Sequence, residues 1–338
     1  MSTLPIALVR SVVLAPMAAF LERERLPYEG LFETVRLSPR LLERPDELIL
    51  LGQACTLLEK ISRSTGIENI GLLAANTIKL DSFVRLRDMA SEGETLFEAL
   101  HRFAWRIAAF NTAERLSLQW QGERLFFSRR YALPPSPVTR HGDTYALVVM
   151  IKLVQRTLGS EWKPDLVLLP RHEHIRKSQY EAFLKTNISF RGDAWAISIP
   201  PSQLAAPVPK PTQDSEGSLA PPSSADIMSS LGAMIRPSLR LAYPDINYAA
   251  GLAGVSVTTL KRRLRDFGLT YSELVETERR RLSIELLAQA DIKISEVASE
   301  LGYTEPANFI RAFRKWTALT PSQFRAHGGA AEGDTSMV

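Results

Sequence analysis

Cationic and amide side chains recur at helical spacing in two stretches near the C-terminal end of the chain. They are Lys261, Arg262, Arg265, Asn308, Arg311 and Lys315. Arginine and lysine donate hydrogen bonds to guanine or to phosphate oxygens, and asparagine pairs with adenine through two hydrogen bonds. Residues of these types recognise nucleic acid when they lie on exposed helix faces, so the elements that position them decide the interpretation.

The segment 246–264 has the pattern of a helix-turn-helix. Ala250 is small enough for two helices to cross closely, and Gly254, four positions later, tolerates the positive φ of a turn. Val255 is expected to fill the space between the helices, and Ser256 to cap the second helix by accepting a backbone N–H bond. The side chains that would then point outward are Val257, Thr258, Lys261, Arg262 and Arg265.

The same pattern recurs over 294–316. Its small residue, turn glycine and apolar plug are Ala298, Gly302 and Tyr303. Thr304 or Glu305 would cap the second helix, and Pro306 falls in its first turn, where a missing N–H costs little. One such match is a weak signal, because any surface helix shows apolar and basic stripes. Two such matches joined by a helix over 271–289 are a much stronger signal.

The region 226–327 resembles the AraC/XylS family of bacterial transcription regulators. The residues that carry the likeness are Ile294-Ser295-Glu296-Val297-Ala298, Leu301-Gly302-Tyr303, Phe309 to Trp316, Thr320-Pro321, Phe324-Arg325, Arg279 and Leu286-Leu287. The chain departs from the family pattern at Ser283, where alanine is usual, at Pro306, and at Thr317-Ala318-Leu319, which lacks the usual glycine.

The resemblance implies a monomeric DNA-binding unit with two recognition helices in successive major-groove segments on one face of the duplex. Carried over by position, the base-reading residues are Thr258, Lys261, Arg262, Ala307, Asn308 and Arg311. The phosphate contacts are Ser256, Thr259, Arg265, Arg314 and Lys315. The implied function is sequence-specific transcription regulation, with double-stranded DNA as the partner and RNA polymerase as a further candidate. For each of Arg263, Arg265 and Arg314, the alternative to a DNA contact is that the side chain is merely solvated.

The chain is predicted to have two domains, because residues 200–224 differ from the rest in composition. This segment is rich in proline and serine and contains no aromatic residue. It can bury too little apolar surface to offset its ordering entropy, which predicts an extended linker between domains at 1–199 and 225–327. Residues 328–338 are small and polar and are predicted to be a disordered tail.

The first domain is predicted to be α+β. Helical spacing of apolar residues occurs at 45–64, 95–111 (with Thr95 and Glu98 as a capping box) and 145–158. A hairpin is expected over 115–131, and short strands are expected at 166–169 and 196–199. The second domain is predicted to be all-α with two helix-turn-helix motifs. Its expected helices are 226–240, 246–253, 257–266, 271–289, 294–301 and 306–316.

The first domain is similar to the arabinose-binding-like half of regulators of the ornithine-utilisation kind. The likeness lies in Gly93-Glu94-Thr95-Leu96, Ala99-Leu100, Phe103 and a domain end near Pro200-Pro201. It implies an effector-binding or dimerising half, without identifying an effector. The helices at 45–64 and 145–158 are more apolar than one core needs, and with this resemblance they predict a homodimer.

The composition fits a soluble cytoplasmic protein. Hydrophobic residues make up 45% and charged residues 23%, and the net charge of +4 permits a nucleic-acid partner without requiring one. A single cysteine, Cys55, excludes an intrachain disulfide. The apolar run at 11–20 is interrupted by Pro16 and followed by charges, which argues against a signal peptide. The run at 145–158 is too short and too charged to span a bilayer, so no membrane partner is expected.

Three other functions are weighed against a transcription regulator. A metal-dependent enzyme would use His172 and His174, but they lie two residues apart and no third ligand is visible. An alkyl-accepting repair protein would need Cys55 as a nucleophile, yet this cysteine lies on an apolar stripe. An architectural DNA-binding protein would carry a wide basic surface, against which the modest net charge argues. We therefore predict no catalytic residue, cofactor or metal site.

Overall fold

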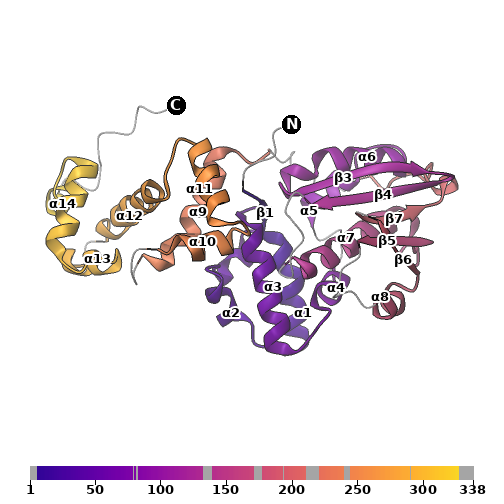
Figure 1. Cartoon of the computed structure of the whole chain (residues 1–338), viewed down its shortest axis with the longest axis horizontal. Coiled ribbons are helices and arrows are strands. Elements are labelled where there is room, and N and C mark those ends of the chain that lie inside the picture. Colours follow the sequence, from indigo (N-terminus) through magenta and orange to yellow (C-terminus); the bar gives the residue numbers. More distant parts are fainter. Residues whose placement is uncertain are drawn as a thin grey trace. The chain divides into compact units, whose positions relative to one another are not determined.

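The structure is a computed structural model and describes residues 6–78, 80, 83–131, 139–170, 177–192, 194–210, 221–239, 244–289 and 291–326. The chain forms two compact units, Met1–Ser223 and Ser224–Val338 (Figure 1). The expected tail at 328–338 and the segment with His172 and His174 lie outside the described residues.

The first unit is α+β, as predicted, and begins with helices around a two-stranded pairing. Its helices are α1 (Ala15–Arg23), α2 (Glu29–Thr34), α3 (Leu51–Thr65), α4 (Ile70–Asn76), α5 (Val84–Ala90), α6 (Leu96–Arg106), α7 (Arg140–Leu158) and α8 (Lys177–Leu184). Strand β1 (Leu8–Arg10) pairs antiparallel with β2 (Leu48–Leu50). Helix α7 packs against α3 and α4 and also against the larger sheet, so it joins the helical and sheet parts of this unit (Figure 1).

The larger sheet has five strands in the order β3-β4-β7-β5-β6. Their bounds are Glu114–Gln121 for β3, Arg124–Tyr131 for β4, Leu166–Pro170 for β5, Asn187–Gly192 for β6 and Trp195–Ile199 for β7. All neighbours are antiparallel except β5 and β6. The predicted hairpin and both short strands are confirmed. Gly122 forms the tight turn between β3 and β4 with φ +59°, a conformation that favours glycine.

The predicted helix over 45–64 is wrong at its start. Residues Leu48–Leu50 form strand β2, and the helix begins only at Leu51. The pairing partner of β2 lies about 40 residues earlier in the chain, so local periodicity did not reveal it. The capping box at Thr95 is half right: Thr95 Oγ1 accepts from the Glu98 N–H, but the Glu98 carboxylate accepts from the N–H of Glu94.

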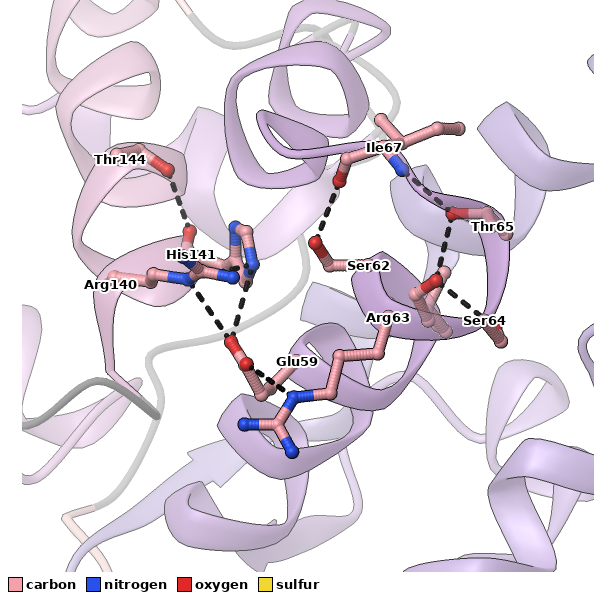
Figure 2. Close-up of polar contacts among 10 residues, drawn as sticks. Glu59, Ser62, Arg63, Ser64, Thr65, Ile67, Arg140, His141 and Thr144 are labelled. Atoms are coloured by element: carbon pink, nitrogen blue, oxygen red, sulfur yellow. Dashed lines mark hydrogen bonds and ion pairs between the residues drawn. The ribbon is translucent and has the colours of Figure 1, made fainter. Parts of the chain in front are cut away.

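The homodimer stays a prediction, but the apolar helices that motivated it are accounted for within one unit. Helices α3 and α7 pack against each other, and their apolar side chains belong to the core of one unit. They meet as well in a polar cluster around the buried Glu59 (Figure 2). Arg63 and Arg140 bind its carboxylate at 2.9 and 3.1 Å. Arg140 Nε also donates to Nε2 of the buried His141 at 3.2 Å, which requires that nitrogen to be unprotonated.

Part of the segment predicted as a linker belongs to the first unit. The N–H groups of Leu96 and Phe97 open helix α6 and donate to the carbonyls of Ala206 and Leu204 at 2.9 and 3.1 Å. The first turn of any helix leaves such donors unsatisfied, and this returning chain satisfies two of them. Residues 200–210 are therefore packed rather than extended, and residues 211–220 lie outside the described part of the chain.

In its described residues the second unit contains helices and no strand, as predicted. They are α9 (Ser224–Ile235), α10 (Ile246–Leu252), α11 (Val257–Asp266), α12 (Tyr271–Leu287), α13 (Ile294–Glu300), α14 (Pro306–Thr317) and α15 (Pro321–Ala326). The last helix was missed, although the sequence carries its signal. Thr320 and Gln323 exchange side-chain to backbone hydrogen bonds in a capping arrangement.

Candidate nucleic-acid interface

Helix α12 is the central element of the second unit. It lies between α9–α11 on one side and α13–α14 on the other (Figure 1). Thr270 and Glu273 form a reciprocal capping box at its start. At 1.5 Å per residue its 17 residues span about 26 Å, the same order as one turn of DNA, about 34 Å. The two helix-turn-helix motifs are thus built on one helix.

The first motif has the geometry that its sequence predicts. Gly254 makes the turn with φ +69°, and Ser256 Oγ caps α11 by accepting from the Thr259 N–H at 3.1 Å. Leu260 and Leu264 are fully buried. The remaining polar residues on the outer face of α11 are exposed, namely Thr258, Lys261, Arg262 and Arg265.

Three residues of this motif lie less openly than expected. Val257 is only half exposed. Thr259 is also half-buried, and its hydroxyl lies 2.9 Å from that of Ser256. Arg263 is half-buried as well, and burial, helped by the neighbouring Arg262, lowers its pKa while Asp266 opposes the shift. Arg263 is therefore not a fully solvated side chain.

The second motif repeats this geometry on an aromatic core. Gly302 makes the turn with φ +75°, and the Tyr303 N–H donates to the carbonyl of Ala298 at 3.0 Å. Phe309 and Phe313 are fully buried and lie with ring centroids 5.7 Å apart. All five predicted contact residues on α14 are exposed, namely Ala307, Asn308, Arg311, Arg314 and Lys315.

The capping prediction for α14 is right about the position and wrong about the side chain. Glu305 is the N-cap residue, but neither its side chain nor that of Thr304 caps the helix. Instead, the backbone carbonyl of Glu305 accepts from the Asn308 N–H at 3.0 Å. Pro306 has no N–H to satisfy at the first helical position, so the need for a side-chain cap is smaller here.

The exposed faces of α11 and α14 are strongly cationic. Helix α14 contains no acidic residue, and Asp266 is the only one in α11. On α14 the guanidinium of Arg311 donates to Oδ1 of Asn308, so the two side chains are held together on one exposed edge. Guanidinium donors suit guanine and an amide suits adenine, but Asn308 can pair with adenine only when Arg311 releases its Oδ1.

Two contacts hold the second motif against the rest of its unit. The guanidinium of Arg279, on α12, lies over the ring of Tyr303 at 5.0 Å from the centroid. Burial raises the pKa of Tyr303, and Arg279 partly opposes this shift. Gly302 lies so close to the carbonyl of Leu239 that a Cβ built on it would stand 2.2 Å from that oxygen. These contacts hold the turn before α14 against α12 and against Leu239.

Comparison with known proteins identifies the family. The model described as "Arabinose-binding domain of AraC transcription regulator, N-term" matches residues 26–208, more than half of the chain. A helix-turn-helix domain model matches residues 249–327. The chain belongs to the AraC family of transcription regulators. The second helix-turn-helix motif lies inside the second match, and the first lies inside it from residue 249 onward.

Individual relatives cover only parts of the chain. The HTH-type transcriptional regulator VqsM of Pseudomonas aeruginosa is 28% identical over 184 residues, which are 52% of this chain and 56% of VqsM. The ornithine utilization regulator of the same organism is 37% identical over 83 residues, 25% of this chain and 24% of that protein. The chain thus matches about half or less of these relatives' lengths.

A solved structure extends over more of the chain at lower similarity. The transcriptional regulator CdpR from Pseudomonas aeruginosa is 20% identical, and the match covers 93% of this chain and 98% of that one with a TM-score of 0.43. The family assignment rests on the two domain models.

Two further observations concern the described residues alone. Within them no three histidine, cysteine, aspartate or glutamate side chains gather in a way that could hold a metal ion. None of the helices in the described ranges is both long and apolar enough to cross a membrane.

Proposed function

We propose that this AraC-family protein is a sequence-specific DNA-binding transcription regulator that places α11 and α14 in successive major-groove segments. The observation that carries the proposal is the pair of helix-turn-helix motifs on α12, each with its apolar side buried and its cationic side exposed. We propose that it acts on double-stranded DNA in the cytoplasm, with RNA polymerase as a further partner.

The contact residues divide into two groups in this proposal. Base reading falls to Thr258, Lys261 and Arg262 on α11 and to Ala307, Asn308 and Arg311 on α14. Phosphate contacts fall to Arg265, Arg314 and Lys315, and to Ser256 and Thr259, whose hydroxyls already bond to each other at 2.9 Å. Ser256 therefore serves first as a helix cap and only second as a phosphate ligand.

Site libraries test this division. Arg262→Ala and Arg311→Ala should each weaken binding by about 1–3 kcal/mol and relax selectivity at separate positions, about 10 base pairs apart. Lys315→Ala is the matched control and should weaken all sequences nearly equally, because a phosphate contact carries no base information. If both arginine variants altered the same base positions, or none, the two-helix model would be wrong. Uniform affinity for every sequence would indicate an architectural protein.

We also propose that the protein pairs through its first unit. Phe97, His101 and Trp105 lie four residues apart along α6 and are exposed, with Trp105 retaining 74% of its surface. An aromatic stripe of this size on a helix is typical of a protein interface. Trp105→Ser should shift full-length protein toward monomer in sedimentation. A sedimentation coefficient unchanged from wild type would argue against this face.

A further inference from the structure

The first unit contains an apolar cavity of about 110 Å³. Helices α3 and α7 supply much of its wall. The rest comes from residues of β1, α1, α5, α6 and β3–β4 and from the chain that precedes α1, α5 and β3. The facing side chains include Ala54 and Leu58 on α3 and Ala146 and Val149 on α7. Ala146 and Val149 keep accessible surface in the middle of a packed helix, as expected where a helix borders a cavity rather than other side chains.

Most of the polar lining of the cavity belongs to a buried ion cluster, and Tyr145 on α7 adds a phenol to the wall. Arg129 is 1% exposed and binds Glu114 at 2.7 Å and Asp143 at 2.8 Å. Asn111, which also lines the cavity, donates to Glu114 at 3.5 Å. Burial raises the pKa of Glu114, and Arg129 opposes that shift. One guanidinium thus faces two carboxyl groups, so the cluster offers no surplus positive charge.

We infer that this cavity binds a small, neutral, largely apolar molecule with one hydrogen-bonding group, which in the proposed function would be the effector. A cavity of about 150 Å³ takes up benzene, so this smaller cavity of about 110 Å³ limits the ligand to about one six-membered ring. A carboxylate or phosphate would be buried beside Glu114 and Asp143 without a cation of its own, at high cost. A sugar would bury several hydroxyls against apolar walls, each losing about 1–3 kcal/mol without a partner. The ligand is therefore neither anionic nor a sugar, although the family model that matches residues 26–208 describes an arabinose-binding domain.

Three probes of comparable size test the inference on full-length protein. Benzyl alcohol, benzoate and arabinose are titrated at pH 7 by calorimetry, and melting temperatures are measured in parallel. Benzyl alcohol should bind saturably and raise the melting temperature, whereas benzoate and arabinose should do neither. Benzoate is the matched control, since it differs from benzyl alcohol mainly in its charge. Binding of benzoate or arabinose at similar affinity, or no binding of benzyl alcohol at millimolar concentration, overturns the inference.

Cavity-filling variants locate the bound probe. Ala146→Leu places extra methyl groups in the cavity and should weaken benzyl alcohol at least tenfold. Val149→Ile adds one methyl group and should weaken benzyl alcohol binding less. This variant replaces Ala146→Leu in the test if the larger change disturbs folding. Ala19→Leu is the control, because Ala19 lies exposed on α1 and its change should leave binding intact. Unchanged affinity in both cavity variants refutes the site.

The outcome is independent of the DNA-binding proposal. A protein that binds its DNA site but not benzyl alcohol would refute the cavity inference alone. A protein that binds benzyl alcohol but no DNA would refute the proposed function and leave the cavity site standing.

Discussion

Gly302→Ala should destabilise the second unit more than any other glycine-to-alanine change discussed here. A left-handed backbone costs a residue with a Cβ about 1–2 kcal/mol. The new methyl group would also stand 2.2 Å from the Leu239 carbonyl oxygen, a backbone atom that cannot turn aside. Overpacking of this kind costs about 1–3 kcal/mol. The total expected loss is about 2–5 kcal/mol of unfolding free energy.

Substitutions at two other glycines separate the backbone cost from the steric clash. Gly268 has φ +72° but open space around its Cβ position, so Gly268→Ala should show the backbone cost alone, about 1–2 kcal/mol. Gly251 lies inside α10 with open space and no positive φ. Gly251→Ala should therefore stabilise the protein by about 0.5–1 kcal/mol through its better helix propensity.

Urea unfolding of the three full-length variants gives the free energies, and hydrogen exchange assigns each change to a unit. Gly302→Ala should speed exchange in α13 and α14 and also near Leu239, because the clash forces these segments apart. Equal losses for Gly302→Ala and Gly268→Ala would show that the contact with Leu239 carries no weight, and the reasoning would fail.

Three further measurements bear on other parts of the chain. Burial and the neighbouring Arg140 lower the pKa of His141 to about 4, and Glu59 only partly opposes this shift. The neutral form is favoured on folding, so stability is full above about pH 6.5 and should fall by about 3 kcal/mol as pH drops to 4; His141→Gln should flatten that part of the urea-unfolding profile. Ala318 ends α14 with φ +61°, and Ala318→Gly should raise the free energy of unfolding by about 1 kcal/mol in urea titration. If six to ten phosphates are neutralised, DNA affinity should fall by about 10³–10⁵ between 50 and 200 mM salt, and a flat profile in binding titrations would contradict phosphate contacts.

The sequence was most informative where a structure depends on neighbouring residues. Turn glycines such as Gly254 and Gly302 and caps such as Ser256 act within a few positions, and both motifs lie where these residues predict. Strand β2 depends on a distant partner, and the packing of residues 200–210 depends on the start of α6. Composition and periodicity cannot show such long-range contacts, and both predictions failed there.

The same distinction applies to the interface itself. Exposure of side chains such as Arg262 and Arg311 follows from helix periodicity, so the sequence could nominate them. The distance between α11 and α14 should depend instead on packing inside the unit, including Arg279 over Tyr303 and Gly302 against Leu239. A protein that reads two groove segments at once needs this distance to match the helical repeat. Selectivity for a two-part site should therefore depend on these packing residues as strongly as on the side chains that reach the bases.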